Sequence, residues 1–224
     1  MKRIAIIVAG GIGKRMNSKL PKQFLKIRDE VILMRTIRTF HDFDKNMELI
    51  IGLPANAIST WKRLCSEENF NIPHKLAEGG ETRFHTIKKA LKYVYSCSVV
   101  AVHDGVRPLV DQKTIQRAFK KAEASGNAIP VADIHESIRL ITASENKAVP
   151  RKYYKLVQTP QVFRSDILLS AYEQEYDPDF TDDASVVEKT GVSINTVKGN
   201  PENIKITTKK DLAVAETLLQ FMEK

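Results

Sequence analysis

The stretch Ile4-Ala5-Ile6-Ile7-Val8-Ala9, followed at once by Gly10-Gly11-Ile12-Gly13-Lys14-Arg15-Met16, decides the fold of this chain. Its first part is a continuous apolar run rich in β-branched residues, which is the pattern of a strand buried on both faces of a parallel sheet. Its second part has the glycines that a tight turn after such a strand requires. Similar apolar runs return later in the chain, at 49–53, 99–102, 128–131 and 193–197.

Helical patterns separate these runs. Apolar residues recur at i, i+3, i+4 and i+7 from Ile87 to Val94, and again from Ile115 to Ala122. Near the C-terminus, Thr208 and Asp211 have the spacing of a helix cap, and an apolar face follows them. This alternation predicts an α/β fold with a mostly parallel, Rossmann-like sheet and helices on both faces. Ligands bind such sheets at the carboxyl ends of the strands.

The chain of 224 residues has an ordinary globular composition, with 42% hydrophobic and 28% charged residues. That composition excludes a disordered chain, a collagen and a coiled coil, and the length favours a single domain over 1–224. No apolar run approaches the ~20 residues of a membrane span, and the N-terminal run lacks the features of a secretory signal. We therefore expect a cytoplasmic protein with no membrane partner. Two cysteines, Cys65 and Cys97, fit a reducing compartment.

The balance of charge is basic. Lysine and arginine outnumber the acids by 35 to 27, which gives a net charge of +8. Nucleic-acid binding is one explanation, but the sequence contains no block rich in Lys and Arg and no RNP, KH or zinc-finger pattern. A basic pocket for a small polyanion explains the excess as well. We therefore expect no nucleic acid as a partner.

One stretch, from about 133 to 161, breaks the alternation of strands and helices. It contains two strand-like pieces, 137–142 and 153–157, on either side of the turn-rich segment 143–146. We predict that the two pieces form a hairpin inserted into the α/β domain. Two interpretations remain open, namely a surface hairpin without a special role and an arm that packs against a second subunit.

The glycine-rich segment 9–16 can bring its backbone N–H groups close to phosphate oxygens, because glycine has no Cβ in the way. It does not match a dinucleotide-binding fingerprint, which needs glycine in place of Met16. Nor does it match a Walker loop, which needs glycine in place of Val8 and Ser or Thr in place of Arg15. A plain strand-to-helix turn is the alternative. In the nearby PKQF, Lys22 adds a cation of the kind that stabilises charge on a transferred phosphoryl group.

Charged side chains follow the predicted strand 99–102. Asp104 comes just past it, at the edge where ligands bind, and a carboxylate there is suited to Mg²⁺ shared with phosphates. A turn or helix-cap role is the alternative for this aspartate. Arg107 adds a partner for an anion, whereas His103 lies nearer the strand and is more typical of a hydrogen-bonded structural histidine.

Three further segments contain candidate residues. The segment 79–86 is a second glycine turn before a helix, and its free N–H groups with Arg83 suit a base, a ribose or a phosphate. A plain turn with a solvated arginine is the alternative there. The segment 180–184 has the pattern of a helix cap. Lys205 alternates with Ile204 and Ile206, and a lone lysine in such a segment is usually exposed to solvent.

The order and spacing of these segments resemble those of the 2-C-methyl-D-erythritol 4-phosphate cytidylyltransferase family, from about residue 4 to residue 218. The opening loop is shared by many sugar-nucleotide transferases, and the later motifs narrow the resemblance to cytidylyltransferases of polyol phosphates. The motifs are AGGIGKRM (9–16), PKQF (21–24), GGETR (79–83), VHDGVRP (102–108), QTPQVF (158–163), TDDASVVE (181–188) and NIKIT (203–207).

Two alternatives accompany this resemblance. The first is a ribitol-5-phosphate cytidylyltransferase. Enzymes of that kind share most of the motifs but tend to have TDAC where this chain has TDDA. The motif HDGVRP is intermediate between the two families, because many methylerythritol enzymes have HDAARP. A catalytically inactive nucleotide-binding protein on the same fold is an alternative of another class. Retention of four charged residues together argues against it, since an inactive copy has no need of all four: Arg15, Lys22, Asp104 and Lys205.

The resemblance implies a nucleotidyltransferase sheet, a hairpin arm that forms a homodimer, and Mg²⁺ bound by Asp104. It implies that CTP and 2-C-methyl-D-erythritol 4-phosphate give 4-diphosphocytidyl-2-C-methyl-D-erythritol and pyrophosphate, in the non-mevalonate route to isoprenoid precursors. The residues implied to act on the reacting phosphates are Arg15, Lys22 and Lys205. Those implied to hold the nucleotide are Ala9, Gly10, Gly11, Gly13, Gly80, Arg83 and Thr86. Those implied to hold the polyol phosphate are Asp104, Arg107, Ser137, Arg151, Thr159 and Lys205.

The chain departs from the family pattern at two of these positions. Thr86 stands where serine is usual, and Ser137 stands where threonine is usual. Both substitutions keep a hydroxyl, so a hydrogen bond can survive. Arg151 lies eight residues before Thr159, the spacing that the family has, and the adjacent Lys152 is the competing candidate for the phosphate ligand of the arm.

Overall fold

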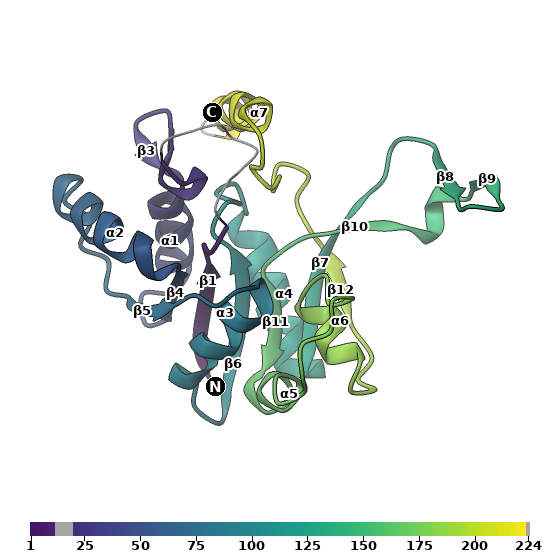
Figure 1. Cartoon of the computed structure of the whole chain (residues 1–224), viewed down its shortest axis with the longest axis horizontal. Helices are drawn as coiled ribbons and strands as arrows, with labels where there is room; N and C mark the ends of the chain where they lie inside the picture. Colours follow the sequence, from purple (N-terminus) through teal and green to yellow (C-terminus); the bar gives the residue numbers. More distant parts are fainter. Residues whose placement is uncertain (12–19, 223–224) are drawn as a thin grey trace.

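The computed structural model describes residues 1–11 and 20–222. Its main sheet has eight strands in the order β10-β7-β11-β6-β1-β4-β5, with β12 paired to β7 (Figure 1). The strand β1 (Lys2–Val8) lies between β4 (Glu48–Leu53) and β6 (Ser98–Asp104), and is parallel to both. The predicted α/β fold with a mostly parallel sheet is confirmed.

The part of the sheet beyond β6 mixes strand directions. The strand β11 (Gln161–Arg164) lies between β6 and β7 (Asn127–Asp133) and is antiparallel to both. Outside it, β10 (Lys155–Val157) is antiparallel to β7, whereas β12 (Thr196–Lys198) is parallel to β7. Because β11 is antiparallel to β6, it begins near the carboxyl end of β6, and the residues just before it lie beside Asp104.

Helices cover both faces of this sheet (Figure 1). Successive residues of β1 point to opposite faces: Ile7 belongs to a core cluster with Phe40 and Trp61, and Ile6 to a second cluster with Phe84. The first cluster contains side chains of α1 (Ile32–Phe43), α2 (Ala55–Glu67) and α4 (Gln112–Ser125). The second contains side chains of α3 (Arg83–Ala90), α5 (Ser165–Ala171) and α6 (Asp183–Glu188). None of the helices within 1–11 and 20–222 is both long and apolar enough to cross a membrane.

The last helix, α7 (Lys209–Met222), begins at the predicted cap. The backbone N–H of Asp211 donates to Thr208 Oγ1 at 3.2 Å, and that of Thr208 donates to Asp211 Oδ2 at 2.8 Å. Its inner face joins a third cluster that includes Ile206, whose backbone N–H donates to the Val106 carbonyl at 2.9 Å. This packing brings the segment 203–207 beside the end of β6.

The stretch from about 133 to 161 carries a hairpin that projects away from the main sheet (Figure 1). Its strands are β8 (Ile138–Ile141) and β9 (Asn146–Val149), which pair antiparallel. The prediction that 153–157 is the second strand was wrong, because the chain reverses within 142–145, where Thr142 N–H donates to the Glu145 carbonyl at 2.8 Å. The piece 155–157 is instead β10 of the main sheet. A short pair of strands, β2 (Lys26–Ile27) and β3 (Glu30–Val31), precedes α1.

Candidate active site

The predicted site residues gather at the carboxyl ends of β1 and β6. Asp104 is the last residue of β6, and Ala9 and Gly10 follow β1 directly. Lys22 begins a short 3₁₀ turn after Pro21, and its Nζ donates to the carbonyl of Ile206 at 3.2 Å. A cavity of about 430 Å³ opens here, and its lining includes Ala9, Gly10, Gly11, Lys22, Gly80, Arg83, Thr86, Asp104 and Lys205.

A second cavity of about 260 Å³ adjoins the first. Arg83, Asp104 and Lys205 line both cavities, so these three side chains form the wall between them. The second cavity is also lined by Arg107, Val157, Gln158, Thr159, Gln161, Thr181 and Asp182. Two ligands that meet at this wall would meet beside two lysine or arginine cations and one carboxylate.

Three cations surround the carboxylate of Asp104, whose exposed fraction is 6%. Lys205 Nζ lies 2.9 Å from Oδ2, Arg107 Nε lies 3.3 Å from Oδ2, and Arg83 Nε lies 3.4 Å from Oδ1. Burial raises the pKa of Asp104, but the charges of Arg83, Lys205 and Arg107 outweigh burial and hold that pKa well below its usual range. The carboxylate is therefore ionised at any physiological pH.

His103 has the structural role that the sequence indicated. Its ring is fully buried; Nε2 lies 3.1 Å from the Arg107 carbonyl, and Nδ1 lies 3.0 Å from the Thr159 hydroxyl. Because a carbonyl only accepts, Nε2 carries the proton and Nδ1 accepts from Thr159. Burial lowers the pKa of His103 to about 4, so the ring is neutral.

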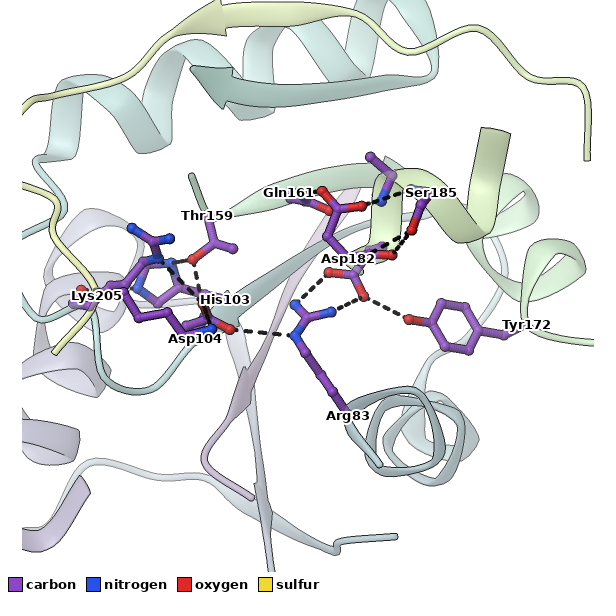
Figure 2. Close-up of polar contacts among 12 residues, drawn as sticks. Arg83, His103, Asp104, Thr159, Gln161, Tyr172, Asp182, Ser185 and Lys205 are labelled. Atoms are coloured by element: carbon purple, nitrogen blue, oxygen red, sulfur yellow. Dashed lines mark hydrogen bonds and ion pairs between the residues drawn. The ribbon is translucent and has the colours of Figure 1, made fainter. Parts of the chain in front are cut away.

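The buried residues Asp183 and Tyr172 hold Arg83 in place. In Figure 2, Arg83 lies between Asp104 on one side and Tyr172 on the other. Its Nη1 and Nη2 donate to the two carboxylate oxygens of Asp183 at 2.9 and 2.7 Å. The hydroxyl of Tyr172 donates to Asp183 Oδ1 at 2.7 Å. Burial lowers the pKa of Arg83, and the charges of Asp183 and Asp104 raise it by more. Burial, with the charge of Asp183, raises the pKa of Tyr172 well above its usual value.

Sequence reasoning missed Asp183 and Tyr172. The expected helix cap in TDDASVVE is confirmed, since Asp182 accepts from the backbone N–H of Ser185 at 2.8 Å. The cap uses only Asp182, so Asp183 is left without a local role, and this was the signal in the sequence that could have identified it. No local pattern singled out Tyr172.

The second glycine turn is held together by Thr86. Its hydroxyl accepts from the Gly80 N–H at 3.0 Å and donates to the Thr82 carbonyl at 3.0 Å. A Cβ at Gly80 would lie 2.4 Å from His85 Cβ, so only glycine fits. A Cβ at Gly52 would lie 2.7 Å from the methyl carbon of Thr86. The glycine at 52 therefore provides the space for the methyl group of Thr86.

Known proteins share the sequence pattern and the fold of this chain. The sequence model of the family described as 2-C-methyl-D-erythritol 4-phosphate cytidylyltransferase (IspD) matches residues 3–221. The chain belongs to this family. Proteins of that name from Bacteroides fragilis and Phocaeicola vulgatus are 54% and 49% identical to it over 219 residues, which cover 98% of this chain and 100% of each relative.

Solved structures of the family share the fold. The 2-C-methyl-D-erythritol 4-phosphate cytidylyltransferase from Thermus thermophilus is 29% identical with a TM-score of 0.78, covering 98% of this chain and 100% of that one. The 4-diphosphocytidyl-2C-methyl-D-erythritol synthase from Anaerococcus prevotii is 26% identical with a TM-score of 0.83, covering 98% of this chain and 96% of that one.

Some residues that the family resemblance singles out do not join this cluster. Ser137 and Arg151 lie exposed in the projecting stretch, and neither lines either cavity. The guanidinium of Arg151 donates to the carbonyl of His135. Gly13 and Arg15 lie outside the described residues. Thr159 lines the second cavity, but its buried hydroxyl accepts from the backbone N–H of Asp104 at 3.1 Å.

The donor set at Asp104 fits a magnesium ion that is shared with a substrate. Within residues 1–11 and 20–222, no group of three or more His, Cys, Asp or Glu side chains is arranged to hold a metal ion. Asp104 nevertheless offers an ionised carboxylate at the wall between the two cavities. Mg²⁺ is commonly held by one or two carboxylates together with substrate phosphates and water. A single ionised aspartate that lines both cavities matches that pattern.

Proposed function

We propose that this protein couples CTP with 2-C-methyl-D-erythritol 4-phosphate to give 4-diphosphocytidyl-2-C-methyl-D-erythritol and pyrophosphate, a step in the non-mevalonate formation of isoprenoid precursors. Membership of the family supports the reaction. The observation that carries it in this chain is the wall of Arg83, Asp104 and Lys205 shared by two adjoining cavities. Two polyanions meeting there would have their reacting phosphates beside fixed positive charge.

The larger cavity is the proposed CTP site. The backbone of 9–11 and the turn at Gly80 surround it, and glycine permits the close approach of a phosphate or a base. Thr86 and Arg83 also line this cavity and belong to the proposed cytidine pocket. We assign Gly13 and Arg15 to the same loop, on the family motif alone.

The smaller cavity is the proposed site of the polyol phosphate. Its lining includes Arg107, Lys205 and Thr159. We infer that the chain acts as a homodimer in which Ser137 and Arg151 come from the partner's arm. The support is that the projecting stretch leaves large apolar side chains in solvent, whereas a two-stranded hairpin alone is marginal in water. The exposed set is Leu140 41%, Ile141 70%, Tyr153 74% and Tyr154 47%, with Leu156 56% on the adjoining β10.

Asp104 is the proposed ligand of Mg²⁺, which would neutralise the triphosphate and the leaving pyrophosphate. The chain supplies the remaining electrostatics. Lys22 and Lys205 line the same cavity from two segments that touch each other, since Lys22 Nζ donates to the carbonyl of Ile206. Fixed cations of this kind stabilise charge that develops in the transition state without reorganising.

The reaction needs no side chain to act as a general base. A phosphate oxygen of the polyol substrate forms a bond to the α-phosphorus of CTP, and the bond from that phosphorus to the β-phosphate oxygen breaks, releasing pyrophosphate. The second pKa of a phosphate monoester is ~6, so the nucleophile is already anionic near neutral pH. Alignment and positive charge are then sufficient, which agrees with a neutral, fully hydrogen-bonded His103.

Steady-state release of pyrophosphate tests the proposal. The purified chain is given CTP and Mg²⁺ with either 2-C-methyl-D-erythritol 4-phosphate or ribitol 5-phosphate at equal concentrations. We expect a kcat/KM at least roughly tenfold higher for the methylerythritol substrate, about the discrimination that 1.4 kcal/mol gives, and no release without a polyol phosphate. A higher kcat/KM for ribitol 5-phosphate would mean that ribitol 5-phosphate is the substrate. No release of pyrophosphate with either compound would contradict the proposal.

A further inference from the structure

Two carboxylates share the guanidinium of Arg83, and they share it unequally. Asp183 takes both terminal nitrogens at 2.9 and 2.7 Å, which is the bidentate geometry that Arg and a carboxylate prefer. Asp104 takes only Nε, at 3.4 Å. The guanidinium therefore lies against Asp183 and touches Asp104 only at its edge.

The position of Asp183 is determined by the sheet that carries Asp104. Asp183 is the first residue of α6, it is fully buried, and Tyr172 donates to its Oδ1. Gln161 ties the start of this helix to β11: its Nε2 donates to Asp182 Oδ2 at 2.7 Å, and its Oε1 accepts from Ala184 N–H at 2.8 Å. Because Gln161 pairs with Val102 of β6, Asp183 and Asp104 are anchored to the same two strands.

The removal of Asp183 would change what Arg83 does. The side chain of Arg83 is 27% exposed, and a guanidinium largely removed from water gains from moving closer to the nearest remaining carboxylate, which is Asp104. Lys205 and Arg107 already contact Oδ2 of Asp104, so a closer Arg83 would take Oδ1, the less engaged oxygen and the one left for a hard cation. Arg83 and Mg²⁺ would then compete for one carboxylate.

We propose that Asp183 is a positioning residue: by holding Arg83 in a bidentate pair, it prevents the guanidinium from closing onto Asp104 and so keeps that carboxylate available to Mg²⁺. This inference rests on the proposed function, in which Asp104 binds the ion. A role of Asp183 in stability alone would lower the folded fraction of the protein without changing its requirement for Mg²⁺.

The test measures the Mg²⁺ concentration that half-saturates CTP binding, by calorimetry without the polyol phosphate, so that no turnover occurs. We expect Asp183→Asn to raise this concentration roughly tenfold, within the range of coupling energies between contacting residues. Asp183→Glu, which keeps the charge, should give a lower value than Asp183→Asn. The effect should disappear where no guanidinium competes: whatever Arg83→Met does to CTP binding itself, adding Asp183→Asn to Arg83→Met should change the value by less than about threefold.

The proposal is overturned if Asp183→Asn leaves the Mg²⁺ requirement unchanged, or if Asp183→Asn raises it by as much in the Arg83→Met background as in the wild type. Thermal unfolding checks that each variant is folded. If Asp183→Asn does not fold, Arg83→Met is compared with the double variant: equal values support the proposal, and a larger difference than about threefold overturns it, since Asp183 would then act without Arg83. A wild-type chain that binds no CTP would instead contradict the proposed function, and this inference with it.

Discussion

The hydroxyl of Thr159 accepts a hydrogen bond from the backbone N–H of Asp104 at 3.1 Å and lies 3.0 Å from Nδ1 of the buried His103. One side chain just before β11 thereby fixes the last two residues of β6. The same aspartate carries the charge on which the site depends, so the packing beneath the site and its electrostatics are linked through Thr159.

Replacement of that hydroxyl should destabilise the fold. Thr159→Val keeps the shape of the side chain but leaves the N–H of Asp104 and Nδ1 of His103 without a partner, which costs about 2 kcal/mol. Thr159→Ser retains the hydroxyl and is the matched control. Urea unfolding of the two variants measures the difference, and equal midpoints would mean that water replaces the hydroxyl.

His103 makes the stability of the metal-free protein depend on pH. Its pKa is about 4 in the folded state, where burial disfavours the charged ring, against ~6.5 in the unfolded chain. The unfolded state therefore binds more protons between these values, and the contribution of His103 to the free energy of unfolding, present above pH ~6.5, is lost as the pH falls toward 4. The loss reaches about 3 kcal/mol at most, since each pKa unit is worth about 1.4 kcal/mol.

Urea unfolding between about pH 7 and about pH 4.5, within the window set by the two pKa values of the histidine, checks this dependence against His103→Asn. The pKa of Asp104 is lowered, so that carboxylate titrates below this range. We expect a shallower slope of stability against pH in the variant, and equal slopes would contradict the assignment.

Loss of the Lys22 charge should affect the transition state more than the binding of CTP. We expect Lys22→Ala to lower kcat by two or more orders of magnitude, as for one lost charge-stabilising donor, with a smaller change in the Kd of CTP. Lys26→Ala is the control, because Lys26 pairs with Glu68 at 2.8 Å and lines neither cavity. A near-normal kcat in Lys22→Ala would remove Lys22 from the reaction.

Neutralising Asp104 should raise the Mg²⁺ requirement of the reaction. Asp104→Asn keeps an oxygen but loses the charge that attracts the cation, so we expect a half-saturating concentration roughly tenfold higher or more. Asp111→Asn is the control, since Asn caps α4 as well as Asp does. An unchanged magnesium dependence of pyrophosphate release would place the metal elsewhere.

The arm should act on the partner's site. Arg151 lies in the projecting stretch and lines neither cavity of its own chain. Inactive Lys22→Ala and Arg151→Ala chains, mixed and allowed to exchange, should then regain about a quarter of wild-type activity, as two-fold symmetry gives one intact site per mixed dimer. Mixing Lys22→Ala with Asp104→Asn, assayed at a Mg²⁺ concentration too low for Asp104→Asn to work, is the control and should regain nothing, since both defects lie in the same half of the site.

No recovery with the arm variant, despite demonstrated subunit exchange, would mean that Arg151 acts within its own chain or not at all. Replacement of the neighbouring Lys152 by alanine in the same experiment distinguishes the two candidate phosphate ligands of the arm.

Local sequence patterns predicted the central strands because burial on both faces requires continuous apolar runs. They missed β5 (Lys75–Glu78) and β11 for identifiable reasons. β5 is an edge strand with exposed Lys75 and Glu78, so its run is interrupted by charge. β11 has four residues, two of them polar, and its antiparallel place between β6 and β7 has no local signature. The hairpin was expected, but the pairing of its second strand was not.

By itself, the sequence determined the strand–helix alternation, the glycine turns and the charged residues at the strand ends, since each follows from short-range sterics and periodicity. It also carried the order of motifs by which Lys22, Asp104 and Lys205 were predicted to belong to one site. Only the tertiary structure decided that Arg83 makes its bidentate pair with Asp183 and a single contact with Asp104. Such a choice depends on which strands are neighbours and on what is buried between them, because the strength and geometry of an ion pair are set by distance and dielectric rather than by separation along the chain.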